Sequence, residues 1–176
     1  MSKISVSRIL RDHIKTLRAS EKDAVSKPDL FLFYGLPLII AFIVVDFSNP
    51  TAETDWNGQA LTFFGIFLAL LINVQVALFA ILQRGRSAQS SSKRANLQAA
   101  DLELRRALLG EINATISYLN LVCVIALAIS LSMSVASVGS RAAVLVLLIF
   151  YSHFLLTMLM VLKRSHALFQ KEYEKS

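Results

Sequence analysis

Four long runs of apolar residues divide the chain, and polar segments separate them. The runs cover residues 30–47, 60–82, 116–138 and 142–162. Each is close to the about 20 residues that a helix needs to cross the hydrocarbon core of a bilayer. Apolar and polar residues do not alternate within the runs, which excludes the strands of a closed barrel. The pattern predicts an all-α integral membrane protein with a bundle of four transmembrane helices.

The same pattern predicts five successive segments. Residues 1–29 form a basic arm, and residues 30–82 form the first transmembrane hairpin. Residues 83–112 form a linker and a helix, residues 113–162 the second transmembrane hairpin, and residues 163–176 a tail. A cleavable signal peptide is not expected, because a long polar arm precedes the first apolar run.

Lysine and arginine residues lie almost entirely on one side of the predicted bundle. Of the 18 such residues, seven precede the first run, six lie between the second and third runs, and four follow the fourth. Only Arg141 lies on the opposite side. Because lysine and arginine favour the cytoplasmic side, we expect both termini and the central segment in the cytoplasm. The expected location is the inner (cytoplasmic) membrane, as a multi-pass protein.

The composition excludes other classes of protein. Hydrophobic residues make up 55% of the chain and charged residues 17%, whereas a soluble domain is roughly one quarter charged. One core cannot bury so many apolar side chains at this length, so an ordinary soluble enzyme and a disordered chain are excluded. The single cysteine, Cys123, excludes a disulfide framework and a cysteine-based zinc site.

Residues 4–18 have the pattern of an amphipathic helix with a basic face. The cations recur three or four residues apart, at Arg8, Arg11, Lys15 and Arg18. Such a helix lies at a membrane surface, with its cations near anionic lipid. The alternative is a solvated helix or one bound to a partner. Direct binding of nucleic acid is not expected, since no aromatic residues interleave the cations.

Residues 95–109 favour a helix on the cytoplasmic side. Leu97, Leu104 and Leu108 form a narrow apolar seam along it. The seam can pack against another copy of the chain, a cytosolic partner or the base of the third span. In the alternative interpretation, the helix rests on its own bundle.

Four polar side chains lie at similar depths inside the predicted spans. Asn73 and His153 each lie nine residues from the cytoplasmic end of their span, and Asn120 lies eight from Ile112. This places them ~12–13 Å from the inner boundary, and Gln75 lies slightly closer to it. Such groups need partners or water. They therefore form either an interhelical hydrogen-bond clamp or a polar path.

Small residues recur four positions apart on the third span. One series is Ala126, Ser130 and Ser134, and the other is Ala128, Ser132 and Ala136. Small residues let membrane helices approach closely. Two series on one helix predict contacts on two sides, one within the monomer and one between copies.

No arrangement of residues indicates catalysis. The chain has no phosphate-binding loop and no hydrolase or zinc-protease motif. His13, His153 and His166 fall in different segments without the spacing of metal ligands. No carboxylate lies mid-membrane, which disfavours a proton-coupled carrier. We expect no enzyme activity, no cofactor and no metal.

In overall plan the sequence resembles small four-span membrane components of bacterial anti-phage defence systems, such as the Kiwa membrane subunit. The features that carry the resemblance are the basic arm, the four spans and the cytosolic insert from Leu97 to Leu109. It covers the whole chain at the level of architecture, without a shared motif, so no functional residue carries over. The resemblance implies a homo-oligomeric inner-membrane sensor or anchor that is coupled to a cytosolic protein.

Two functions are consistent with these features. The first is a non-catalytic, self-associating membrane subunit that anchors a cytosolic protein partner and signals to it, in antiviral defence. The alternative is a homo-oligomeric pore or permeability effector, which depends on the polar residues inside the spans.

Overall fold

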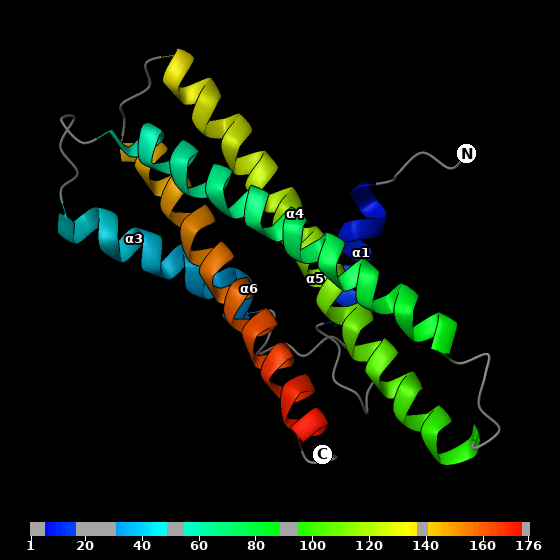
Figure 1. The fold of residues 1–176 in the computed structure, drawn as a ribbon. Helices are drawn as coiled ribbons and strands as arrows, with labels where there is room; N and C mark the ends of the chain where they lie inside the picture. The colour runs from blue at the N-terminus through cyan, green and yellow to red at the C-terminus, as the bar shows by residue number, and fades with distance from the viewer. Residues whose placement is uncertain (1–5, 17–30, 49–54, 89–94, 137–140, 174–176) are drawn as a thin grey trace.

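The computed structural model describes residues 6–16, 31–48, 55–88, 95–136 and 141–173. All regular elements in these ranges are helices (Figure 1). They are α1 (Val6–Thr16), the short π-helix η1 (Phe31–Gly35), α3 (Leu36–Ser48), α4 (Trp56–Ala88), α5 (Ala95–Val135) and α6 (Arg141–Tyr173). The prediction of an all-α chain is confirmed for the described residues.

Three of the helices are long and apolar enough to cross a membrane. The spans cover Trp56–Ile81, Arg106–Val135 and Arg141–Ala167. A shorter apolar helix covers Phe31–Phe47, where the sequence predicts the first span. These helices indicate a membrane protein, as the apolar runs predict.

The helices extend beyond the apolar runs. α5 has 41 residues, about 62 Å at 1.5 Å per residue, so the predicted helix 95–109 and the third span form one continuous helix. α4 continues to Ala88, into the segment predicted as a linker, and residues 89–94 lie outside the described part. Alanine, leucine, glutamate and arginine favour helix in water too. A helix therefore does not end where its apolar run ends.

Asp55 caps the start of α4. Its Oδ1 atom accepts a hydrogen bond of 2.9 Å from the backbone N–H of Gly58. Its carbonyl oxygen accepts one of 3.2 Å from the N–H of Gln59. A cap of this kind satisfies N–H groups that have no partner within the helix.

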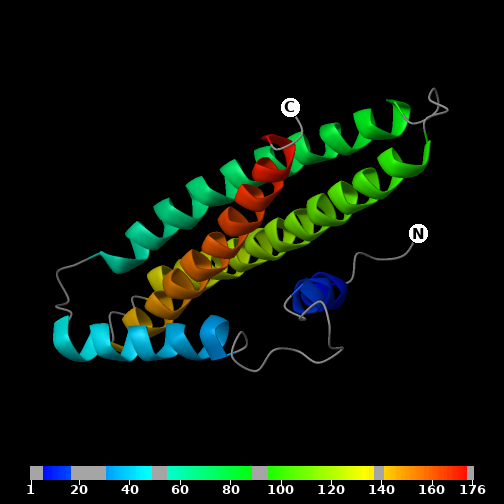
Figure 2. The same ribbon diagram turned by 90° about the horizontal axis from the view of Figure 1, so that it is seen from below.

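The three long helices α4, α5 and α6 contact one another, and of these three α3 packs against α6. α4 lies along α5, α6 packs against α5, and α3 crosses α6 obliquely (Figure 1). α1 lies against α5 on the side away from α4 (Figure 2). The described parts of α3 and α5 make no close backbone contact. This leaves space between η1 and α3 on one side and α5 on the other.

The main core lies where α4, α5 and α6 meet. Five aromatic rings cluster between α4 and α6, with centroids 4.6 to 5.8 Å apart; they belong to Phe63, Phe64, Phe67, Tyr151 and Phe154. Aromatic pairs in this geometry stabilise packing beyond the area that they bury.

The two series of small residues on α5 differ in burial. Ala126 and Ser130 are fully buried. Ala128, Ser132 and Ala136 are exposed. Ser134, the last member of the first series, is exposed as well. The first two members of that series therefore serve contacts within the monomer, and the second series lies on the outer surface.

Candidate functional site

Gln75 of α4 and Asn120 of α5 join their helices through side-chain hydrogen bonds. The Asn120 Nδ2 atom donates to the Gln75 Oε1 atom at 2.9 Å. The Gln75 Nε2 atom donates to the Ser117 Oγ atom at 2.8 Å, and Ser117 donates to the Asn113 carbonyl at 2.9 Å. The three polar side chains form a continuous chain of hydrogen bonds, so the structure brings together two of the four predicted polar residues.

Asn73 lies apart from this chain. It is exposed on the outer surface of α4, inside the apolar span Trp56–Ile81. Two residues along a helix correspond to about 200°. Asn73 and Gln75 therefore lie on opposite sides of α4, although their depths are similar.

His153 of α6 belongs to a separate cluster on the other side of α5. Its Nδ1 atom lies 2.8 Å from the Phe33 carbonyl oxygen, and its Nε2 atom lies 2.7 Å from the Tyr118 hydroxyl. A carbonyl only accepts, so Nδ1 carries a proton. In the neutral ring, Nε2 then accepts the Tyr118 proton. One imidazole thus connects η1, α5 and α6.

The Phe33 carbonyl is available to His153 because of Pro37. In an α-helix this carbonyl accepts a hydrogen bond from the N–H group four residues later. Residue 37 is a proline, which has no N–H group, and the chain forms the π-helix Phe31–Gly35 at this point. The His153 ring supplies the donor that the backbone lacks.

His13 is the residue through which α1 meets this cluster. Its ring is fully buried and stacks on Tyr118, with centroids 3.9 Å apart and planes within 5°. Burial lowers the pKa of His13 from 6.5 to about 4, with smaller effects from His153 and Arg164. The neutral ring is therefore the form that packs against the bundle.

The contact of α1 with α5 is expected to weaken in acid. Protons bind His13 more tightly when α1 is detached, so packing loses stability as the pH falls from 6.5 and stops losing it near 4. A spin label on Arg11→Cys, in a Cys123→Ala background, should become more mobile over this range. The control is His13→Phe, which keeps an aromatic ring but takes no proton. The mobility of the label in this control should not depend on pH between 6.5 and 4. If the control shows the same pH dependence as the protein with His13, the role of His13 is contradicted.

Arg164 of α6 makes polar contacts with two residues of α5. Its guanidinium lies 3.6 Å from the Glu111 carboxylate and 3.4 Å from the Thr115 hydroxyl. A partly buried ion pair of this kind is not expected in the middle of the hydrocarbon core. The Arg164 and Glu111 pair therefore places a membrane boundary near the first turns of the α5 span.

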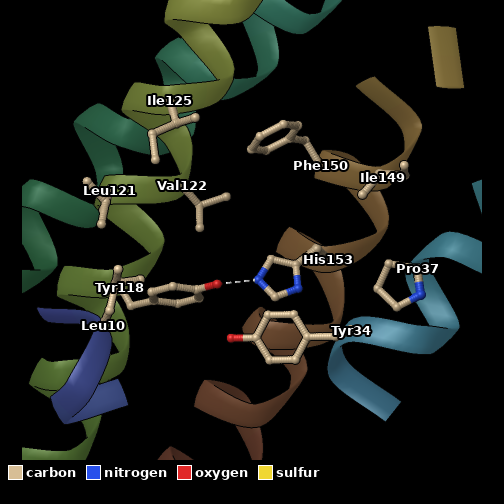
Figure 3. A pocket seen from close by; sticks show the side chains of 10 residues that line it. All are labelled: Leu10, Tyr34, Pro37, Tyr118, Leu121, Val122, Ile125, Ile149, Phe150 and His153. Carbon is tan, nitrogen blue, oxygen red and sulfur yellow. Dashed lines mark hydrogen bonds between the residues drawn. The ribbon is translucent and has the colours of Figure 1, made fainter. Parts of the chain in front are cut away.

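A cavity of about 260 Å³ lies between α5, α6 and η1 with α3. Figure 3 shows Tyr34, Tyr118 and His153 together at one end of it. Apolar side chains line the remainder, among them Val122 and Phe150. Leu10 of α1 contributes to the wall near Tyr118 (Figure 3).

The predicted residues of the arm are only partly described. Arg8 and Arg11 are exposed, and Arg8 lies 3.9 Å from Asp12, an exposed pair that stabilises little. The side chains of Lys15 and Arg18 lie outside the described part. Three apolar side chains of α1 remain 39–51% exposed and available to lipid, namely Val6, Leu10 and Ile14.

Only one residue of the predicted leucine seam can be placed. Leu108 is half-buried on α5, next to the buried Leu109. The side chains of Leu97 and Leu104 lie outside the described part, although both residues belong to α5. The interaction predicted for the seam stays a prediction.

The chemistry of the site is hydrogen bonding and apolar binding. Among the described residues, no three histidine, cysteine, aspartate or glutamate side chains gather closely enough to hold a metal ion. The sequence pattern missed Tyr34, Tyr118 and His13 as partners of His153. Pro37 was the signal available, because a proline inside an apolar helix leaves a carbonyl free for a donor elsewhere.

Comparison with protein families, curated proteins and solved structures gives no match to this chain.

Proposed function

We propose that the chain is a non-catalytic, oligomeric subunit of the inner membrane that anchors a cytosolic protein partner. Four spans, with both termini in the cytoplasm, are part of this proposal. The resemblance in architecture supports anti-phage defence as its setting. The observation that carries the proposal is the position of Asn73.

Asn73 lies at the centre of an exposed stripe on α4. The stripe follows helical spacing and is otherwise apolar or small; it consists of Ile66, Leu70, Asn73, Ala77 and Ile81. A primary amide in contact with lipid loses its hydrogen bonds to water. A second copy of the chain can restore them, because membrane helices associate through amide hydrogen bonds and close packing. The stripe therefore favours self-association through α4.

Replacing Asn73 with leucine is expected to weaken self-association. One interhelical hydrogen bond per copy contributes about 0.6 kcal/mol on average, so a symmetric pair should lose roughly five- to tenfold in dimer affinity. Native mass spectrometry of the full chain in lipid nanodiscs measures the change. Asn73→Gln should retain an amide and the oligomer. Val74→Leu, on a neighbouring exposed position of α4, is the matched control. Equal oligomer fractions in Asn73→Leu and wild type would contradict the proposal.

The proposed topology depends on charge and on helix length. η1 and α3 together have 18 residues, about 27 Å as regular helix, which is enough for the span predicted at residues 30–47. A reporter fused after the C-terminus should therefore indicate cytoplasm, and so should one inserted at Ala88. A signal from the opposite side of the membrane at either position would contradict the four-span arrangement.

The parts of α4 and α5 that extend beyond their spans are the proposed binding surface for the cytosolic partner. α5 has 11 residues before Arg106, where its span begins, and α4 continues beyond Ile81. These extensions lie on the predicted cytoplasmic side and offer a surface away from lipid.

The alternative function, a pore, requires ion flux in liposomes that contain this chain alone. Such flux from wild-type protein, abolished by Gln75→Leu, would contradict an anchoring role.

A further inference from the structure

The cavity between α5, α6 and α3 has a polar end and an apolar end. Among the described residues, the polar side chains that line it belong to Tyr34, Tyr118 and His153, and none of them is an acid, a lysine or an arginine. In Figure 3 these three side chains lie together, while Ile125 and Phe150 lie at the opposite end. A ligand with one small polar group and an apolar body matches this division.

The two ends of the cavity lie at different depths in the membrane. Tyr118 is seven residues, about 10 Å, from Glu111, whose ion pair with Arg164 marks the boundary. Ile125 is another seven residues, again about 10 Å, farther from this boundary. Because the hydrocarbon core is about 30 Å thick, the cavity lies across the middle of the membrane. Its polar end is the end nearer the Arg164 and Glu111 pair.

The hydrogen bonds at the polar end define the head group. Tyr118 donates its proton to His153, so its oxygen retains lone pairs that accept. The Tyr34 hydroxyl points toward Tyr118 in Figure 3 and is hydrogen-bonded to it. A ligand hydroxyl both donates and accepts, so it can join this pair through the lone pairs and the rotatable O–H groups that remain. A charged head group has no counter-charge among the described side chains that line the cavity.

The cavity is accessible from the lipid phase. α3 packs on α6 and makes no close backbone contact with α5 in the described residues. Tyr34 and Ile125, on either side of this space, are 39% and 41% exposed. Its volume of about 260 Å³ exceeds that of the ~150 Å³ apolar cavity that binds benzene. A short alkyl chain can therefore enter sideways.

We propose that this cavity binds one uncharged amphiphile from the membrane, with a hydroxyl head against the Tyr34 and Tyr118 hydroxyls and an alkyl chain that extends toward Ile125 and Phe150, away from the Arg164 and Glu111 pair. α1 covers the head-group end, since Leu10 lines the cavity and His13 stacks on the other side of Tyr118. This site is independent of the stripe on α4, so it goes beyond the proposed function.

Photolabelling of the full chain in lipid nanodiscs tests the proposal. The probe is decanol with a diazirine on its alkyl chain, and peptide mass spectrometry locates the adducts. We expect adducts on Val122, Ile125 or Phe150, and unmodified decanol should compete for them. Decanoate at a pH where it is ionised, and decane, should compete at least about fivefold less well, the factor for one neutral hydrogen bond of ~1 kcal/mol. Equal competition by all three compounds would overturn the proposal, since it indicates simple partition into lipid.

Variants separate the cavity from the surface of the bundle. Val122→Phe fills the cavity and should reduce competed labelling to the background of the outer surface. Ile125→Phe does so at a half-exposed position that tolerates a larger side chain, should Val122→Phe not fold. Val124→Phe, exposed on α5 and outside the cavity, is the matched control and should label as wild type. In Tyr118→Phe, decanol should compete for labelling no better than decane does. Competed labelling that persists in both cavity variants would overturn the proposal.

Discussion

Replacing His153 with leucine is expected to lower the free energy of unfolding by about 2–6 kcal/mol, the largest effect of any substitution considered. The imidazole holds the Phe33 carbonyl at 2.8 Å and the Tyr118 hydroxyl at 2.7 Å. Leucine has a similar volume but no polar atom, so both partners lose a hydrogen bond in a buried place, at about 1–3 kcal/mol for each. Reversible unfolding in mixed detergent micelles measures the change.

A second substitution tests the reason for this effect. Pro37→Ala restores a backbone N–H group four residues after Phe33, where it can bind the freed carbonyl. The double variant His153→Leu with Pro37→Ala should therefore be more stable than His153→Leu alone. The single variant Pro37→Ala is the control. A double variant no more stable than His153→Leu would show that the carbonyl does not depend on the histidine in this way.

Replacing Asn120 with leucine should destabilise the contact of α4 with α5 by about 1–3 kcal/mol. The substitution removes the donor to Gln75 and leaves the Gln75 Oε1 atom without its 2.9 Å hydrogen bond. The same unfolding measurement applies.

Gln75→Leu combined with Asn120→Leu is the informative control for this pair. With both amides replaced by apolar groups, neither leaves the other unsatisfied, and Ser117 keeps the hydrogen bond that it donates to the Asn113 carbonyl; such paired replacements are often near neutral. The double variant should therefore recover most of the stability that Asn120→Leu loses. Additive losses in the double variant would contradict a direct pairing of the two side chains.

The spans could be predicted from hydropathy because a long apolar run has one stable conformation in lipid, a helix. The ends of the helices could not. The segment from Ala95 to Gly110 contains two arginines, an aspartate and a glutamate, yet its residues favour helix strongly enough to continue α5 beyond the apolar run. Helix propensity and membrane insertion are separate effects, and only the second leaves a sharp boundary in the sequence.

Depth along a helix predicted which polar residues share a level, and it missed the direction in which each one points. Gln75 and Asn120 meet because α4 and α5 are neighbours. Asn73 lies at nearly the same depth on the opposite side of α4. His153 finds its partners on α5 and η1, and the pairing of helices that places them there is a property of the fold. The sequence pattern alone does not contain it.

The central claim, an oligomer built through α4, is tested most directly by cross-linking in native membranes. Asn73→Cys is made in a Cys123→Ala background, since Cys123 is the chain's only cysteine, and mild oxidation follows. We expect a disulfide-linked dimer at position 73 and far less at Phe79→Cys, which is exposed on α4 away from the stripe. Equal cross-linking at the two positions, or monomer at both, would contradict the claim.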